Sequence, residues 1–166
     1  MSPRAAWRLE LLGFRTVYDY VTGKQNWLSS GLPTEGEKAT EPRAGKVARS
    51  DVPVCALEDK LGDVVERLRD TPWRACVVVN EERVVLGLLR EKELAGDPGQ
   101  TVEQAMQPGP STFRPYVSIF ELARFMQDHD LESAPITTGE GVLVGLLTKD
   151  GAVRAAAEAH RGHGDD

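Results

Sequence analysis

The amino-acid sequence predicts a mixed α/β (α+β) protein with two tandem βαββα repeats that form one module, preceded by a short separate segment. The 166 residues are 40% hydrophobic and 28% charged, which is typical of a soluble globular protein. Two cysteines are too few for a disulfide framework, and the longest apolar run is too short to span a membrane. From residue 51 onward, the same order of elements recurs after 58 residues, which indicates a duplicated unit.

The first repeat is expected over residues 51–107 and begins with a short strand. Apolar residues recur at helical spacing over residues 61–68, which predicts an amphipathic helix. Residues 75–79 are almost all apolar, as in a strand that is buried on both faces. A polar turn, a third strand at residues 84–89 and the start of a second helix follow.

The second repeat, expected over residues 108–158, has the same elements in the same order. An amphipathic helix precedes a strand at residues 134–137, and a glycine turn leads to a strand at residues 142–147 and a last helix. The Gly-Leu-Leu triplet of residues 87–89 returns at residues 145–147. This agreement in order and spacing favours two tandem units over one ordinary domain.

The remaining residues fall into three pieces. Residues 1–36 are expected to form a helix with a buried face that includes Leu12, a strand at residues 16–21 and a short second helix. These residues are too few to bury a core of their own. Residues 37–50 have the glycine, proline and charge content of an exposed linker. Residues 159–166 are expected to be a flexible tail.

Charge is divided unevenly along the chain. Residues 1–50 have a net charge of +3, whereas residues 51–166 have a net charge of −9. Because an acidic surface repels phosphate backbones, we expect no nucleic-acid partner, and we expect no membrane partner either. The sequence contains no Cys/His cluster with metal spacing and no Ser-His-Asp set. We therefore expect no catalytic residue, no metal and no required cofactor.

Candidate binding residues lie where the last strand of each repeat passes into a helix. Such a junction presents free backbone N–H groups and the positive end of the helix dipole, which together attract an anion. In the second repeat, Thr148 occupies the N-cap position and Asp150 follows, with a carboxylate suited to ribose hydroxyls. In the first repeat, Arg90 takes the place of Thr148 as a phosphate contact, and Glu93 takes the ribose role. Simple helix capping remains an alternative explanation for these residues.

These junctions resemble a known family. Residues 145–148 (Gly-Leu-Leu-Thr) are similar to the strand end of a CBS domain, named for cystathionine β-synthase. In that family an Asp follows three residues after the Thr or Ser, whereas here Asp150 comes one place early. Residues 87–89 match in the first repeat, but Arg90 replaces the hydroxyl residue. Pro135 corresponds to a proline that often enters the strand in this family.

The resemblance covers residues 47–158 and implies a fold and a function. Tandem CBS pairs pack into one disc-like module, often dimeric, with clefts for adenosine-containing ligands such as AMP, ADP, ATP or S-adenosylmethionine. It implies a non-catalytic, cytoplasmic sensor whose partners are such a ligand, a second copy of the chain and a regulated protein. A ligand-free dimerisation module remains an alternative. The residues implied in ligand binding are Gly87, Arg90, Glu93, Pro135, Gly145, Thr148, Lys149 and Asp150.

The N-terminal segment has a resemblance of its own. Gly13-Phe14, Trp27 and Gly31-Leu32-Pro33 resemble the C-terminal third of a rhodanese-like sulfurtransferase domain. In that family a cysteine in an anion-binding loop, placed before this segment, carries the sulfur. The segment is therefore interpreted either as a degenerate remnant without the catalytic loop or as the end of a domain whose start precedes this sequence. Cys55 and Cys76 fall on expected core strands, so a degenerate sulfurtransferase is the weaker alternative.

Overall fold

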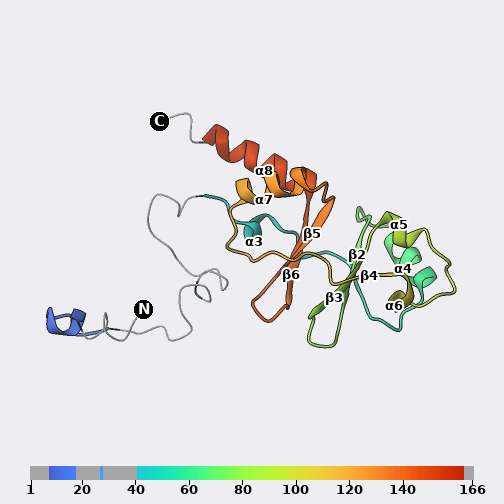
Figure 1. Ribbon diagram of the computed structural model, residues 1–166, viewed down its shortest axis with the longest axis horizontal. Coiled ribbons are helices and arrows are strands. Elements are labelled where there is room, and N and C mark those ends of the chain that lie inside the picture. The colour runs from blue at the N-terminus through green and yellow to red at the C-terminus, as the bar shows by residue number, and fades with distance from the viewer. Residues whose placement is uncertain (1–7, 18–26, 28–40, 163–166) are drawn as a thin grey trace.

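Short strands alternate with helices along the part of the chain that carries the repeats (Figure 1). The computed structural model describes residues 8–17, residue 27 and residues 41–162. The elements are α3 (Ala44–Val47), β1 (Val54–Cys55), α4 (Leu61–Leu68), β2 (Cys76–Val79), β3 (Val85–Leu89), α5 (Glu91–Leu94), α6 (Val102–Ala105), β4 (Gln107–Pro108), α7 (Ile119–Asp128), β5 (Ser133–Thr137), β6 (Leu143–Thr148) and α8 (Lys149–Gly162).

The first half of the module follows the hydrophobic pattern. α4 buries Leu61, Val64 and Leu68, which recur at helical spacing and therefore share one face. The strands form a sheet in the order β1-β2-β3-β4, in which β1 and β2 are parallel. β2 is a central strand with all four residues buried, and it pairs antiparallel with β3 so that Val78 lies opposite Gly87. A strand that is apolar on both faces is thus placed in the middle of the sheet.

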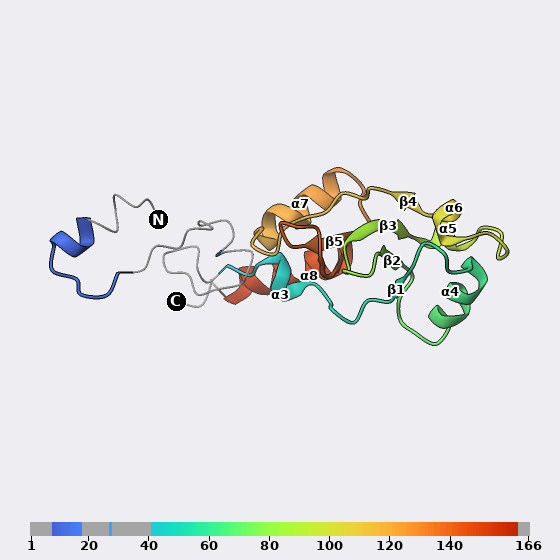
Figure 2. The same cartoon turned by 90° about the horizontal axis from the view of Figure 1, so that it is seen from below.

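The second half repeats this arrangement with a smaller sheet. β5 and β6 form an antiparallel pair, and every residue of β5 is buried. The counterpart of β1 is reduced to one parallel bridge between Phe113 and Ile136, where the first half pairs Cys55 with Val78. α7 packs against α8 (Figures 1 and 2). α7 buries Ile119, Leu122, Ala123 and Met126. The expected mixed α+β class is confirmed.

Residues 41–50 do not form the exposed linker that their composition predicts. Ala44 is completely buried in the core of the second half, and its N–H donates to the carbonyl oxygen of Val117 at 2.9 Å. Arg49 and Leu146 exchange two backbone hydrogen bonds, both of 3.0 Å. This segment therefore crosses to the second repeat. Small and charged residues occur in both linkers and packed crossings, which is why composition alone gave the wrong expectation.

The segment around α6 makes the matching crossing in the opposite direction. The N–H of Val102 donates to the carbonyl oxygen of Asp59 at 2.9 Å, and β4 pairs with β3 so that Pro108 lies opposite Gly87. The bond made by Val102 lies 58 residues after the one made by Ala44, as the repeat requires. Each half is thus completed by the segment that precedes the other repeat.

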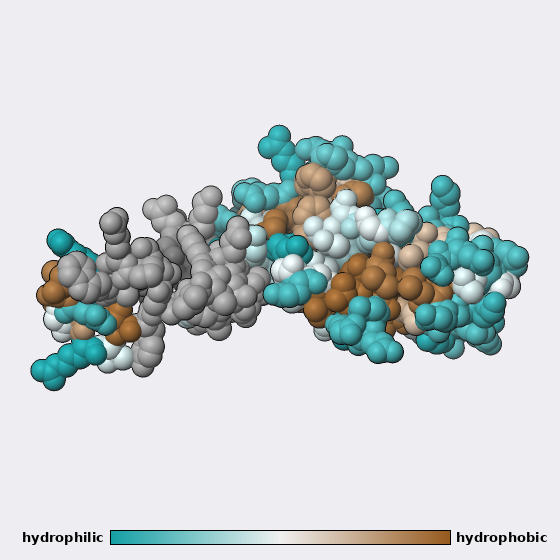
Figure 3. Space-filling model, turned by 60° about the horizontal axis from the view of Figure 1, so that its bottom comes forward, coloured by the Kyte–Doolittle hydropathy of each residue, from teal (hydrophilic) through white to brown (hydrophobic). Residues whose placement is uncertain are grey.

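The two halves also meet at their hairpin turns. Val84 and Val142 form an antiparallel bridge, and the N–H of Val85 donates to the carbonyl oxygen of Gly141 at 3.0 Å. Leu143 and Leu146 of β6 belong to the hydrophobic core of the first half. Figure 3, seen from the side of these turns, shows apolar side chains gathered on part of this face with hydrophilic ones around them.

The structure describes only residues 8–17 and residue 27 of the N-terminal segment. Residues 8–11 are helical, and Gly13 follows with a φ of +93°, a conformation that ends helices and suits glycine. Leu12 is 66% exposed, so its expected burial is wrong, since nothing in the described part of the chain covers it. Of the strand expected at residues 16–21, the first two residues are not in a strand and the rest lie outside the described residues. Most of the rhodanese-like segment lies outside them as well.

The C-terminal helix is longer than the sequence predicts. α8 extends to Gly162, so residues 159–162 of the expected flexible tail are helical, and residues 163–166 lie outside the described part. Alanine has the highest helix propensity, and the alanines at residues 155–157 and 159 sustain the helix. Among the described residues, no helix combines the length and apolar character that a membrane crossing needs.

Candidate functional site

A cavity of about 890 Å³ lies where the two halves of the module meet. Its wall comes from the end of β6 and the start of α8, the loop before β2, the start of α5 and the crossing segment after α3. Both strand–helix junctions that the sequence indicates therefore reach the same cavity, one through Arg90 and the other through Thr148. Its volume is in the range of small-molecule sites.

The junction of the second repeat is open to the cavity. Thr148 and Asp150 both line it, and both side chains are exposed. The hydroxyl of Thr148 accepts a hydrogen bond from the N–H of Gly151 at 3.2 Å, which makes Thr148 the N-cap of α8. The N-terminus of the 14-residue helix α8, which carries the positive end of the helix dipole, lies beside these side chains. Thr148 is thus the helix cap, and it lies at the cavity together with Asp150, the other expected binding residue of this junction.

The junction of the first repeat is engaged by its own residues. The backbone N–H of Arg90 donates to Oε2 of Glu93 at 3.0 Å, and the Arg90 guanidinium donates to the side-chain oxygen of Gln107. Arg90 lines the cavity, but Glu93 is not among its lining residues. The structure therefore brings Arg90 to the site and uses Glu93 as a helix cap.

Three other expected binding residues lie within the strands and away from the cavity wall. Pro135 is buried in β5, opposite Leu146. A Cβ atom on Gly145 would lie 2.7 Å from the carbonyl oxygen of Arg49, and one on Gly87 would collide with the sulfur of Met106. Both glycines therefore make room for a crossing segment. This close packing explains the Gly-Leu-Leu triplets without a ligand.

Lys149, also expected at the site, is held by carboxylates on the loop before β5. Its Nζ lies 2.8 Å from Oδ1 of Asp130 and 3.6 Å from Oε1 of Glu132. The hydrogen bond with Asp130 raises the pKa of Lys149, and the same bond lowers the pKa of Asp130. The N–H of Lys149 also donates to the carbonyl oxygen of Glu132 at 2.9 Å. Lys149 thus anchors the start of α8 and is not a lining residue.

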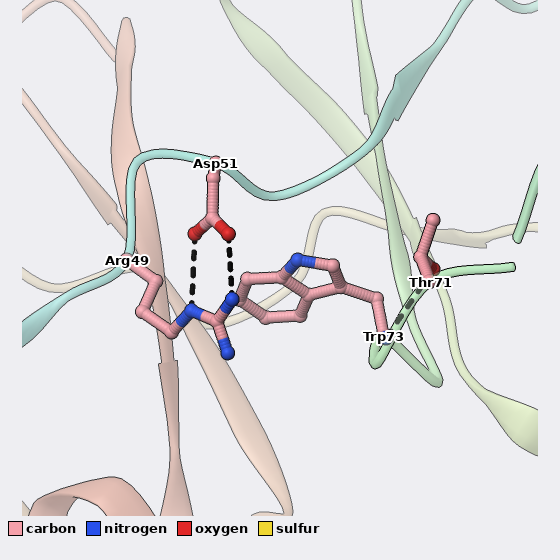
Figure 4. Close-up of polar contacts among 4 residues, drawn as sticks. All are labelled: Arg49, Asp51, Thr71 and Trp73. Atoms are coloured by element: carbon pink, nitrogen blue, oxygen red, sulfur yellow. Dashed lines mark hydrogen bonds and ion pairs between the residues drawn. The ribbon is translucent and has the colours of Figure 1, made fainter.

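The cavity also contains side chains that the sequence analysis did not assign to a site. Trp73 lines it while only 8% exposed, and the Cζ atom of Arg49 lies 4.5 Å from the centre of the Trp73 ring. Arg49 also binds Asp51 through Nε at 3.0 Å and Nη2 at 2.5 Å (Figure 4). Arg74 and Arg154 lie on the same wall. An aromatic face and several guanidinium groups therefore surround the Thr148 junction.

Basic side chains are concentrated at this cavity relative to the rest of the chain. The whole protein has a net charge of −6, yet five basic and four acidic side chains line the cavity. A local excess of positive charge offsets the repulsion that the acidic chain exerts on a phosphate. The basic lining residues are Arg49, Arg74, Arg90, Lys92 and Arg154.

Comparison with known proteins defines the class to which this fold and cavity belong. The sequence model of the CBS domain family matches residues 44–96 and residues 102–158. The chain therefore belongs to the CBS-domain family and carries two CBS domains in tandem. The crossing segments fall inside both matches, in agreement with their packing in the structure.

Individual proteins resemble the chain over its repeats. YtoI of Bacillus subtilis (strain 168) is 27% identical over 142 residues, which are 85% of this chain and 29% of YtoI. The cytosolic domain of the Mg²⁺ channel MgtE in complex with ATP is 27% identical, with a TM-score of 0.63 over 68% of this chain and 48% of that chain. CBSX2 from Arabidopsis thaliana in complex with AMP has a TM-score of 0.65 at 20% identity, over 72% of this chain and 98% of that chain. This last likeness shows the fold alone. The chain thus spans less than a third of the length of YtoI.

Proposed function

We propose that the chain is a cytoplasmic, non-catalytic sensor that binds an adenosine-containing ligand of the AMP, ADP, ATP or S-adenosylmethionine class. Pairs of CBS domains are generally regulatory, and similar pairs have structures with AMP and with ATP. The observation that carries the proposal is the meeting of Thr148, Asp150 and Trp73 in one cavity at the N-terminus of α8. No cofactor is required for this function.

Each part of an adenosine phosphate has a matching group in the cavity. The N-terminus of α8 and the Thr148 hydroxyl are suited to phosphate oxygens, with Arg154 supplying positive charge, whereas Arg74 is already paired with Glu91 at 2.8 Å. The exposed carboxylate of Asp150 is suited to the two ribose hydroxyls. The Trp73 ring is the aromatic surface on which a base is able to stack.

The position of the cavity between the repeats provides a route to a signal. A ligand that contacts Thr148 and Trp73 at once binds only when the two halves are docked. Ligand binding therefore stabilises one packing of the halves over others, and a partner that recognises that packing senses the ligand.

The sensor function is tested by calorimetry and thermal unfolding with AMP, ADP, ATP, NAD and S-adenosylmethionine. At least one of them should raise the melting temperature, because a ligand that binds only the folded state stabilises it. Asp150→Asn should weaken that ligand about tenfold, because it removes a charged acceptor for the ribose. Glu82→Gln, on the exposed turn between β2 and β3, is the matched control and should leave binding unchanged. Absence of binding by all five compounds at millimolar concentration would refute the proposal.

A second, compatible function is assembly into a homodimer or with a regulated protein. Phe125 of α7 is 38% exposed and Val153 of α8 is 37% exposed, although both are large apolar residues. Phe125 also extends an aromatic group, since its ring stacks on His129 and meets Phe113 edge-on. These side chains support a contact surface on α7 and α8, and analytical ultracentrifugation measures whether a dimer forms.

The thiols argue against a degenerate sulfurtransferase. Cys55 is 4% exposed and Cys76 is 1% exposed, so neither is accessible to a sulfur donor. The hydrogen bond with Cys55 and burial together raise the pKa of Cys76, which keeps it a neutral thiol. Sulfur transfer needs an accessible thiolate, and these two cysteines are packed as small apolar residues.

A further inference from the structure

Arg49 connects the two repeats at the edge of the cavity. Its backbone pairs with Leu146 of β6 through two hydrogen bonds of 3.0 Å, which fixes its main chain to the second repeat. Its guanidinium lies over the ring of Trp73, which belongs to the loop before β2 in the first repeat. Figure 4 shows the side chain reaching from one repeat to the other. A change in the partner of this guanidinium therefore changes a contact between the repeats.

The charge of Arg49 is occupied by a carboxylate of the same chain. Asp51 accepts two hydrogen bonds from the guanidinium, an arrangement that a phosphate group is equally able to adopt. The hydrogen bond with Arg49 lowers the pKa of Asp51, so its carboxylate remains charged. Both side chains are more than half exposed, at 52% and 60%, and exposed ion pairs contribute little to stability. The bond is thus strong enough to orient Arg49 and weak enough to exchange.

Asp51 is outside the cavity wall, whereas Arg49 is part of it. A ligand phosphate inside the cavity is therefore able to reach the Arg49 guanidinium.

We propose that Arg49 is an exchangeable latch: the phosphate of a nucleotide replaces Asp51 on the guanidinium. This inference rests on the proposed nucleotide site and adds that Asp51 competes with the ligand. The exchange changes the contact that Arg49 makes with Trp73 across the two repeats, so that ligand binding is transmitted to the packing between the repeats.

The latch occurs once in the module. At the positions 58 residues later, Gln107, Gly109 and Leu131 stand in place of Arg49, Asp51 and Trp73. None of the three has a charged group or an aromatic ring. The equivalent connection therefore has no ion pair of its own, and its Gln107 accepts a hydrogen bond from the Arg90 guanidinium.

Asp51→Asn tests this competition. The variant should bind ATP about threefold to fivefold more tightly than the unaltered chain, because an exposed ion pair no longer holds Arg49. Its affinity for adenosine, which has no phosphate, should be unchanged. In an Arg49→Gln background the effect of Asp51→Asn on ATP should disappear. Glu82→Gln removes a carboxylate on a distant turn and controls for net charge. Calorimetry measures each affinity, and circular dichroism verifies that each variant is folded.

The results separate the latch from the sensor function. If the unaltered chain binds ATP and Asp51→Asn binds it no more tightly than Glu82→Gln does, the latch is wrong and the sensor function stands. Equal tightening for adenosine and ATP would also overturn the latch, because the gain would not depend on phosphate. If Asp51→Asn binds ATP and the unaltered chain does not, the latch is supported. If neither binds any nucleotide, both proposals fail.

Discussion

The half of the cavity beside Thr148 and the half beside Arg90 are related by the repeat but differ in chemistry. The side of Thr148 has two arginines and a tryptophan from the neighbouring elements, all of which line the cavity. The equivalent positions have an amide, an aliphatic side chain and a carboxylate, of which only the carboxylate lines it. The crossing segments, by contrast, make equivalent backbone contacts in the two repeats. Backbone packing and binding chemistry therefore vary independently in this module. The three pairs are Arg49 and Gln107, Trp73 and Leu131, and Arg74 and Glu132.

The largest effect is expected from the two glycines under the crossing segments. Gly145→Ala should lower the free energy of unfolding by about 3 kcal/mol, because its Cβ would meet the rigid carbonyl of Arg49 at 2.7 Å. Gly87→Ala should cost only about 1 kcal/mol, because the flexible side chain of Met106 is able to move away. Urea unfolding of both variants measures the difference. Equal losses would show that the two crossings are equally rigid.

A smaller effect should distinguish the two halves of the cavity in binding. Trp73→Leu replaces the tryptophan with leucine, the residue found at the equivalent position 131. It should weaken the binding of an adenosine ligand about tenfold through loss of stacking. Leu131→Met, a conservative change at the equivalent position, should leave the affinity unchanged. Calorimetry on variants with native circular dichroism spectra decides this. Comparable losses in the two variants would contradict a site confined to the Thr148 half.

The smallest expected effect of the difference between the Thr148 side and the Arg90 side is on the number of ligands bound per chain. Only the Thr148 half combines an exposed N-cap hydroxyl, a carboxylate and an aromatic ring, so we expect one nucleotide for each chain. Titration calorimetry at saturating ligand measures this ratio directly. Two sites of similar affinity would mean that Arg90 compensates for the missing groups on its side.

Much of the fold could be predicted because its signals are local. Helical spacing identifies α4, and a continuous apolar run identifies β2 as a central strand. The crossing of residues 41–50 could not be predicted in this way. Ala44 and Val117 are distant in sequence, and no local pattern states that a short segment with charges packs into a remote core.

The candidate site could be predicted in part for the same reason. Thr148 and Arg90 follow a motif that marks a strand–helix junction, and both reach the cavity. Glu93 fits the same spacing but caps its own helix, because a carboxylate near an N-terminus satisfies backbone N–H groups first. Arg49 and Trp73 belong to no motif that marks a binding site. The 58-residue repeat was the one signal that could have drawn attention to them, because it aligns their positions with the residues that flank the other junction.

The crossing of residues 41–50 to the second repeat affects when the protein folds during translation. Arg49 is synthesised about 100 residues before its partner Leu146, which at ordinary elongation rates is a delay of about 5 to 20 seconds. During this time the strand edge of Arg49 has no partner, and the core that receives Ala44 does not yet exist. A ribosome that stops after the first repeat would release a chain with neither half complete. Folding of this module is therefore a late event in translation, and it closes with the arrival of β6.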